Sequence, residues 1–456
     1  MSPARSSLLV RPELVGIVPD VPPLKAIKLP VVAERHLDNG LRVVVAKRSG
    51  VPRVEARLLV PAARNNSAAP PALSRVLTKT LLSGTPGRTS TEIAQTLQRL
   101  GGHLDAGADS DDFVLSGSAL ASELPAFLGL LAEVVTTATH PDDEVSVQRE
   151  VAAQEITLQL SQPATLARHA LLRRLFGDHP YGQGPPAAAE VQAVKPAQLR
   201  KLQDKRLRPE GAILVLVGDV VPARALDQAG AALADWSSGG GRPGVAKPRP
   251  AAPAPTLLVD RPRSVQTNIR IGGPAVGRSH PDYPKLALAN LVFGGYFVSR
   301  LVDNIRERRG YTYSPGSGVQ QNRRAAFFTV QADVATEVTG PALVEIRYEL
   351  NRMLAGPLEE AELTSAKRYL SGTLSMSIQT QAGLASYLTM LAARDLPVEY
   401  LRQFPAAVEA QDEHDVIEVA RRYLAPRHLR TVMVGDVGSI RAAVEAFDDV
   451  EVQPAG

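Results

Sequence analysis

Metal-ligating and nucleophilic side chains are scarce in this chain of 456 residues. It has no cysteine, which excludes disulfides, thiolate catalysis and cysteine-ligated metal sites, and leaves histidine and carboxylates as possible ligands. No two histidines stand at the three- or four-residue spacing that puts a ligand pair on one helix face. We therefore predict no catalytic metal in this chain. The eight histidines are His36, His103, His140, His169, His179, His280, His414 and His428.

A different chemistry is available to Arg306 and Tyr313, in the segment that runs from Asn290 to Ser314. A guanidinium donates charge-assisted hydrogen bonds to peptide carbonyls, and a phenol can donate to a developing oxyanion. Taken as single residues, the simpler interpretation is a solvated cation and an aromatic residue of a strand. The segment contains three further arginines, Arg300, Arg308 and Arg309.

The residues around this pair predict the backbone that positions it. Gly294 and Gly295 allow the chain to turn and pack closely before a helix. Gly310 is expected to end that helix, and residues 311–313 are expected to form a strand. Gly294, Gly295 and Gly310 thus support the motif rather than perform chemistry.

The first part of the chain predicts a mixed arrangement of strands and helices. Residues 41–46 and 54–60 are rich in β-branched side chains, and residues 48–50 supply turn material, so we expect a hairpin. Three later segments carry apolar residues at three- and four-residue spacing, as amphipathic helices do. Strands with helices on one face would form an α+β layer. The expected helices are 90–100, 123–136 and 142–160.

Two parts of the chain repeat each other. The segment 209–220 aligns with 426–437 at a constant offset of 217 residues, including a proline, Val-Gly-Asp and a final valine. Predicted helices at 196–205 and 413–423 precede the two copies, which favours a duplicated domain over two unrelated strands with similar turns. Between them, residues 237–255 hold four glycines and five prolines, which indicates an extended linker.

We therefore predict an α+β protein of two homologous α/β-layer domains, a tandem duplication joined by a Gly/Pro-rich linker. The expected boundaries are an N-terminal extension at 1–32, a first domain at 33–236, the linker at 237–255 and a second domain at 256–450. Hydrophobic residues at 44% and charged residues at 21% are globular values.

Charge and hydropathy indicate neither a nucleic-acid partner nor a membrane span. The 51 basic and 47 acidic residues nearly cancel, and no block of like charge stands out. No apolar run reaches the roughly 18 residues of a membrane span. The N-terminus has only Leu8-Leu9-Val10 as an apolar stretch, which lacks the core of a secretory signal. We expect a cytoplasmic protein, with a processed precursor as the alternative.

The segment from Asn290 to Ser314 resembles a C-terminal-domain signature of the pitrilysin/insulinase family of zinc metallopeptidases. The resemblance extends over nearly the whole chain, from residues 36–41 to Val437, and residues 178–182 resemble a structural stretch of the family. It implies that Arg306 and Tyr313 match an Arg/Tyr pair that holds substrate backbone and stabilises the tetrahedral intermediate. Tyr311 is the rival tyrosine if the register shifts by two.

The same resemblance implies an inverted zinc motif, His-x-x-Glu-His, on a helix of the first domain, and that motif is absent. Ser83-Gly84-Thr85 looks like the tripeptide that follows it in the family. Counting back from it, Arg75 and Lys79 stand at the histidine positions and Thr78 at the glutamate position. None of these three side chains can perform the family's role.

The helix that would carry the motif is nevertheless expected to form. Its apolar stripe consists of Leu73, Val76, Leu77 and Leu81. The third-ligand position most plausibly falls on Glu155, and a carboxylate facing one or two cations would be a charge-paired former site. We predict that Lys79 or Arg75 pairs with Glu155. The alternative is that Glu155 is an ordinary exposed residue of a helix.

Small bacterial members of the family with two such domains can work as dimers in which one chain carries zinc and the other the Arg/Tyr pair. This chain resembles the second kind. The resemblance implies a non-catalytic subunit of a heterodimeric zinc endopeptidase. It would have no cofactor of its own, would bind an extended peptide such as a leader, and would need a homologous zinc-bearing partner. The alternative is an inactive homologue that acts as a scaffold or peptide-binding protein.

Overall fold

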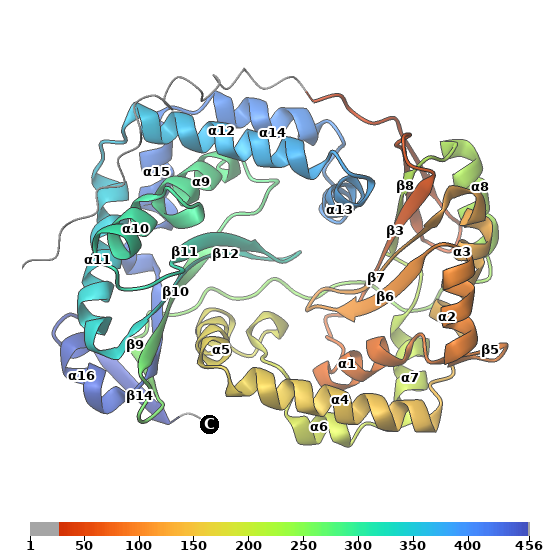
Figure 1. Cartoon of the computed structure of the whole chain (residues 1–456), viewed down its shortest axis with the longest axis horizontal. Coiled ribbons are helices and arrows are strands. Elements are labelled where there is room, and N and C mark those ends of the chain that lie inside the picture. The colour runs from red at the N-terminus through yellow and green to blue at the C-terminus, as the bar shows by residue number, and fades with distance from the viewer. Residues whose placement is uncertain (1–26, 455–456) are drawn as a thin grey trace, which may run out of the picture.

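The computed structural model describes residues 27–454. Most of the predicted N-terminal extension, including Leu8-Leu9-Val10, lies outside the described residues. Two six-stranded sheets dominate the structure, one in a first half before the linker and one in a second half after it (Figure 1). The mixed α/β architecture is the one that the sequence predicts.

The sheet of the first half has the order β1-β2-β8-β3-β7-β6. Its strands are β1 (Val32–His36), β2 (Arg42–Lys47), β3 (Arg53–Pro61), β6 (His103–Ala108), β7 (Asp112–Leu120) and β8 (Ile213–Gly218). A short ribbon of β4 (Gly84–Thr85) and β5 (Arg88–Thr89) lies apart from it.

The sheet of the second half has the order β11-β12-β10-β13-β9-β14. Its strands are β9 (Thr256–Asp260), β10 (Gln266–Ala275), β11 (Gly316–Gln321), β12 (Ala326–Ala335), β13 (Arg430–Gly435) and β14 (Val450–Pro454).

The repeat seen in the sequence is a repeat of structure. Strands β8 and β13 begin and end 217 residues apart, and so do the helices α7 (Pro196–Arg206) and α15 (Glu413–Tyr423). In each half the repeated strand pairs antiparallel with one long strand and parallel with another. The outermost strand differs: β1 is antiparallel to β2, whereas β14 is parallel to β9. The equal spacing in sequence and the matching strand neighbours indicate that the two halves are α/β layers with the same topology around β8 and β13.

The predicted hairpin of the first half is wrong. Strands β2 and β3 are not neighbours, because β8 lies between them and pairs with both. Every residue of β8 is buried, so this strand needs a partner on each side and takes the central place. A turn-like segment between two strands does not reveal that a strand from 150 residues later will separate them.

Helices cover these sheets, and the helices predicted for the first half form within one residue of the expected bounds. The first half contains α1 (Pro71–Thr80), α2 (Ser90–Arg99), α3 (Leu124–Thr137), α4 (Asp142–Ser161), α5 (Pro163–Phe176), α6 (Ala188–Gln192), α7 and α8 (Pro222–Leu233). The second half contains α9 (Tyr283–Asn290), α10 (Arg300–Val302), α11 (Thr339–Ala355), α12 (Glu360–Ser377), α13 (Gln381–Ala392), α14 (Tyr400–Glu409), α15 and α16 (Val437–Glu445).

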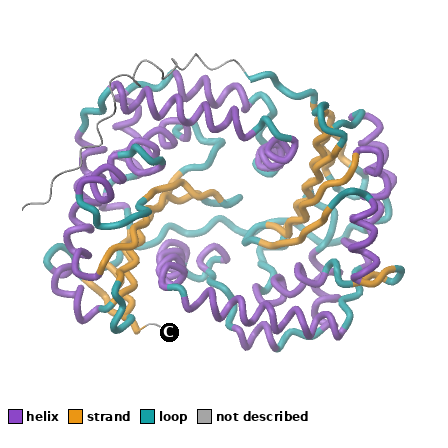
Figure 2. Tube along the Cα trace, in the orientation of Figure 1, coloured by secondary structure: helices purple, strands orange, loops and turns teal. Residues whose placement is uncertain are grey.

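One helix of each half packs on the sheet of the other half. Helix α5 packs on β10 and β13, where Leu171 and Leu175 join a core cluster with Val432. Helix α13 packs on β8 and β3, and Leu388 shares a core cluster with Val215. The linker 237–255 contains neither helix nor strand and crosses as a loop between the halves (Figure 2). The halves are thus joined by packing as well as by the chain.

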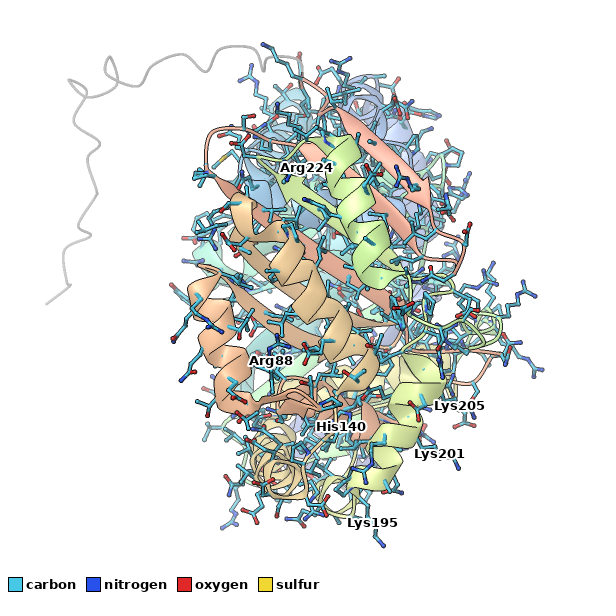
Figure 3. The ribbon with its side chains drawn as sticks, turned by 90° about the vertical axis from the view of Figure 1, so that its right-hand side faces the viewer. Arg88, His140, Lys195, Lys201, Lys205 and Arg224 are labelled. Atoms are coloured by element: carbon cyan, nitrogen blue, oxygen red, sulfur yellow. The ribbon has the colours of Figure 1, made fainter. Side chains whose placement is uncertain are left out.

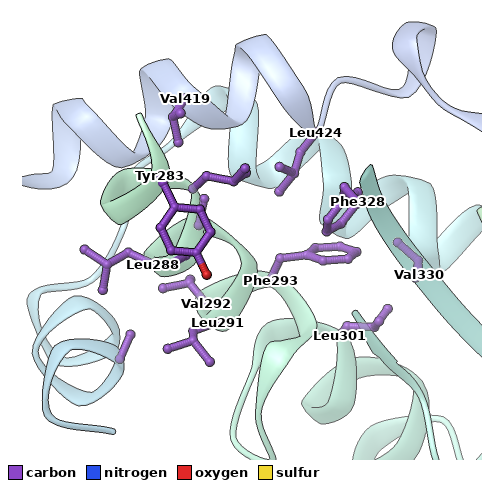
Figure 4. Close-up of a cluster of buried hydrophobic side chains, with 14 of the residues drawn as sticks. Tyr283, Leu288, Leu291, Val292, Phe293, Leu301, Phe328, Val330, Val419 and Leu424 are labelled. Atoms are coloured by element: carbon purple, nitrogen blue, oxygen red, sulfur yellow. The ribbon is translucent and has the colours of Figure 1, made fainter. Parts of the chain in front are cut away.

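One helical stretch, Tyr283–Arg308, is long and apolar enough by composition to cross a membrane. Within the described residues a second candidate arises only if two helical segments bent by 87°, Ala121–Thr137 and Asp142–Ser161, count as one. In Tyr283–Arg308, 67% of the most apolar window is buried inside the protein. Figure 4 shows its Phe293 beside Phe328 of β12, with ring centroids 5.9 Å apart. This burial is typical of a core helix.

Candidate functional site

Helix α1 presents the positions at which the resemblance places zinc ligands. Proline at its first turn starts the helix, since the missing N–H would be unsatisfied there anyway. Val76, Leu77 and Leu81 are fully buried, which anchors one face in the core of the first half. Arg75 and Lys79, four residues apart, therefore project together from another face.

Glu155 of α4 lies against both cations. Its carboxylate accepts hydrogen bonds from Arg75 Nη2 at 3.0 Å and from Lys79 Nζ at 2.9 Å, so the predicted pairing is present and involves both. The hydrogen bond from Lys79, followed by the attraction of Lys79 and the contact with Arg75, lowers the pKa of Glu155. The glutamate is 43% exposed, so this arrangement sits at the surface.

These residues do not fit a zinc ion. Arginine and lysine offer only donors, and both oxygens of Glu155 are engaged by them. The hydroxyl of Thr78 is buried and donates back to the carbonyl oxygens of Ser74 and Arg75. Within residues 27–454, no group of three or more His, Cys, Asp or Glu side chains is arranged to hold a metal ion.

The histidines with defined roles hold the structure together. His140, labelled in Figure 3, is fully buried between Thr80 Oγ1 at 2.8 Å and Gln203 Oε1 at 2.6 Å, and burial lowers its pKa. In the stretch 178–182, His179 accepts from the backbone N–H of Tyr181 and its Nε2 lies 3.0 Å from the carbonyl oxygen of Ala246 in the linker. Both rings serve as hydrogen-bonded connectors.

Arg306 and Tyr313 come together in the second half. The guanidinium carbon of Arg306 lies 4.6 Å from the centroid of the Tyr313 ring and 4.7 Å from that of Phe297. Both rings are exposed, by 79% for Tyr313 and 63% for Phe297. The only ion pair of Arg306 among the described residues joins its Nε to the adjacent Glu307 at 3.1 Å. Two aromatic faces therefore hold the cation while its edge stays available for hydrogen bonds.

The other arginines of this segment have different environments. Arg300 is buried and forms a two-point ion pair with Glu362, at 2.7 and 2.6 Å. Arg308 pairs with Asp303, and Arg309 with Glu345. The environment of Arg306, between two aromatic rings, therefore differs from the environments of its three neighbours.

Two π-helical turns and close-packed glycines shape the backbone here. The turns are η4 (Leu291–Gly295) and η5 (Asp303–Arg308), on either side of α10. A Cβ at Gly294 would lie 2.9 Å from Ser317 Oγ, and one at Gly295 would lie 2.4 Å from Asn290 Nδ2. A larger residue at either position would therefore force Ser317 or Asn290 to move. Gly310 has φ +67° and donates to the carbonyl oxygen of Arg306, which ends the helix as predicted.

The strand predicted at 311–313 is wrong. Those residues form bends, and β11 begins only at Gly316, after Pro315, which lacks an N–H for pairing. Tyr311 packs partly buried against the core of the second half, and its N–H donates to the carbonyl oxygen of Ile305. Tyr313 is the tyrosine that faces Arg306.

Sequence analysis missed Phe297, whose ring completes the clamp on Arg306. Its signal was a large aromatic residue two positions after Gly295, in a segment already singled out. The zinc-motif positions and the Arg306 clamp are not brought together by the fold. Figure 1 shows α1 and α10 in opposite halves, and within the described residues the ion pairs of Arg75 and Lys79 go to Glu155 and that of Arg306 goes to Glu307.

Two family models match the chain. Residues 42–184 match the insulinase family, peptidase family M16, and residues 193–370 match the peptidase M16 inactive domain. The chain belongs to the insulinase family of peptidases. Its zinc-motif positions are occupied by Arg75, Thr78 and Lys79, so it is a member without the family's zinc site.

Relatives and solved structures agree with this assignment. An uncharacterized zinc protease of Mycobacterium tuberculosis is 26% identical over 419 residues, covering 89% of this chain and 93% of the relative. The crystal structure of a peptidase M16 inactive domain from Pseudomonas fluorescens superposes with a TM-score of 0.82 at 25% identity, over 89% of this chain and 98% of that one. A protease from Helicobacter pylori shares the fold, with a TM-score of 0.81 at 19% identity, over 90% of this chain and 100% of the other.

Proposed function

We propose that this insulinase-family member is the non-catalytic subunit of a heterodimeric zinc endopeptidase. It would bind an extended peptide and present Arg306 and Tyr313 to the zinc site of a homologous partner subunit. The observation that carries the proposal is the clamp on Arg306, which keeps a guanidinium fixed between two exposed rings, 4.6 and 4.7 Å away.

The clamp suits a group that must meet a peptide. Stacking fixes the plane of the guanidinium. Its Nε pairs with Glu307, and its two Nη groups, which donate to no other described residue, can donate to peptide carbonyl oxygens. The hydroxyl of Tyr313 belongs to a side chain that is 79% exposed, so it can reach a molecule docked on this surface. When the carbonyl carbon becomes tetrahedral, such a phenol can donate to the oxygen that gains charge.

The residues at the zinc-motif positions of the first half support the proposal of a second chain. At the zinc-motif positions two cations, Arg75 and Lys79, both pair with the carboxylate of Glu155, at 3.0 and 2.9 Å. In such a heterodimer, zinc in the partner would polarise the scissile carbonyl and supply the attacking water. The residues of this chain would bind and orient the peptide.

The test is reconstitution with a homologous chain from the same source that carries an intact His-x-x-Glu-His motif. The two chains are purified separately and mixed, and cleavage of a fluorogenic peptide library is followed. We expect cleavage by the mixture and none by either chain alone. If the zinc-bearing chain cleaves equally well without this one, the chain is an inactive homologue that acts as a scaffold or peptide-binding protein.

A further inference from the structure

A cavity of about 760 Å³ lies where the two halves and the linker meet. The first half contributes the beginnings of β2 and β8 and the end of β3, and the second half contributes the turn between β11 and β12 and the end of α13. Linker residues 242–247 form a further wall. The size is within the usual range of small-molecule sites.

Basic side chains dominate the lining of this junction cavity. Seven arginines and lysines face two aspartates. Both aspartates are already engaged: Asp395 pairs with Arg42, and Asp111 accepts from the hydroxyl of Tyr181 and from a backbone N–H. The seven basic residues are Arg42, Arg242, Lys247, Arg278, Arg323, Arg324 and Arg394.

Five of the seven have no carboxylate partner among residues 27–454, the exceptions being Arg42 and Arg323. Arg394 is half-buried, and within the described part of the chain it donates to two backbone carbonyl oxygens, of Met390 and Gln321, each at 3.3 Å. Burial lowers the pKa of Arg394, and repulsion by Arg278 and Arg323 lowers it further. A half-buried cation beside like charges is costly, and an anion in the cavity would relieve that cost.

Arg278 shows the same absence of a counter-charge. It is half-buried, and its guanidinium carbon lies 5.1 Å from the Tyr283 ring and 6.0 Å from the Tyr387 ring. The tyrosine rings support the cation from behind, as a cation–π contact does. Arg394 is thus held by backbone carbonyl oxygens and Arg278 by tyrosine rings, and neither has a carboxylate partner among residues 27–454.

We propose that the junction cavity binds a small anion with several negative charges, of the polyphosphate class. The basic residues converge from the linker, the 277–279 loop, the β11–β12 turn and the end of α13 on one compact hollow. An extended acidic peptide would instead be read along a line, by alternate side chains beside a strand. Phosphate groups offer several acceptors each and match the guanidinium fork.

Occupancy of the cavity would connect the two halves. A bound polyphosphate would contact Arg324 and Arg394 of the second half, Arg242 and Lys247 of the linker and the strand ends of the first half. It would add charge-assisted contacts across a junction now joined by Arg323 and Asp112. The inference goes beyond the proposed function, because it requires neither zinc nor a partner subunit.

The test is calorimetric titration of the full chain with inorganic tripolyphosphate, together with thermal unfolding. We expect binding that weakens as salt rises, and a higher Tm in the presence of tripolyphosphate. Arg394→Gln and Arg324→Gln should each weaken binding by about tenfold or more, since each removes charge-assisted hydrogen bonds. Arg324 is exposed, so its variant keeps the test valid even if Arg394→Gln fails to fold.

Arg224→Gln is the matched control. Arg224 is an exposed arginine of α8 on the outer face of the first half (Figure 3), and it does not line the cavity. Its variant should bind tripolyphosphate like the original chain. Absence of binding at low salt, or equal weakening by Arg224→Gln, would overturn the proposal. Tighter binding of a hexaglutamate peptide than of tripolyphosphate would overturn the ligand class.

Discussion

The two halves of this chain have one strand pattern around β8 and β13, yet their chemically important surfaces have opposite characters. On α1 of the first half, Arg75 and Lys79 are bound to Glu155, and little hydrogen-bonding capacity is left for a ligand. In the second half, Arg306 lies between two exposed rings and keeps donors free. The scaffold is retained in both, and a few side chains decide which half can act on a substrate.

Helix α1 shows how a fold can be kept without a metal site. The buried stripe of α1 keeps the helix in place, so the exposed positions can be exchanged at little cost in stability. The carboxylate of Glu155 contacts both cations and offsets part of the repulsion between them. Loss of zinc ligands and loss of structure are therefore separable in this family member.

Restoring the family's zinc ligands on α1 would remove the main chemical difference of the first half. Arg75→His, Thr78→Glu and Lys79→His, made together, should give a chain that binds about one zinc ion, because the two histidines are four residues apart beside Glu155. This is the largest expected effect, since tight zinc sites contribute about 10 kcal/mol or more. Metal analysis after dialysis measures it.

The control for the restored site is the same triple variant with Glu155→Gln, which should retain less than stoichiometric zinc. A folded triple variant that holds no zinc would show that the ligand geometry of α1 and α4 has been lost together with the ligands.

The second prediction concerns the hydrogen-bond donors of Arg306 and Tyr313 in the second half. Arg306→Ala should lower peptide cleavage by the reconstituted pair roughly 100- to 1,000-fold, the usual loss for one donor to a developing charge. Tyr313→Phe removes only the hydroxyl and should act through kcat, because the ring still supports Arg306. Arg308→Ala, an exposed neighbour paired with Asp303, is the control and should leave activity unchanged. Unchanged activity of both Arg306→Ala and Tyr313→Phe would remove their assigned role.

A third prediction concerns the junction that lets the two halves act as one body. Asp112 is buried and receives two hydrogen bonds from Arg323, at 2.9 and 2.7 Å. Burial raises the pKa of Asp112 from 3.8 to about 6, although Arg323 opposes the shift. The folded protein then holds the proton more tightly than the unfolded chain, so this contribution to stability is full below pH 4 and is lost as pH rises to about 6.

Denaturant unfolding between pH 4 and pH 7 measures that loss, which amounts to at most about 3 kcal/mol. Asp112→Asn should remove this part of the pH dependence, because asparagine stays neutral at the buried position and does not lose stability as pH rises from 4 to 7. Asp395→Asn is the control, since that carboxylate is 93% exposed. An unchanged pH slope in Asp112→Asn would contradict the assignment.

The smallest effect is expected at the ion pairs that Glu155 forms with Arg75 and Lys79. Glu155→Gln should change the free energy of unfolding by less than about 1 kcal/mol, because the ion pairs are partly exposed. The pKa of Glu155 is lowered, so its contribution is present at neutral pH and is lost as pH falls. Glu150→Gln, an exposed change on the same helix, is the control in thermal unfolding at pH 7 and pH 3. A large destabilisation would mean that this cluster supports the fold.

Much of the fold was predictable because local signals determined it. Apolar spacing gave α2, α3 and α4, the 217-residue repeat gave the shared design, and glycine and proline gave the linker. The hairpin of β2 and β3 failed because strand order depends on long-range pairing. The strand at 311–313 failed because Pro315 and the stacking of Tyr313 on Arg306 take that segment out of the sheet.

The sequence by itself determined which chemistry this chain can offer: no cysteine, no paired histidines, and cations at the zinc-motif positions. Residue types are sufficient for that, since a lysine cannot ligate zinc while it is protonated. Only the tertiary structure decided that Phe297 completes the clamp on Arg306. It also decided that α5 and α13 each pack on the sheet of the other half, and that basic residues from distant segments meet at the junction. Those features depend on contacts between residues far apart in the chain, and no local pattern encodes them.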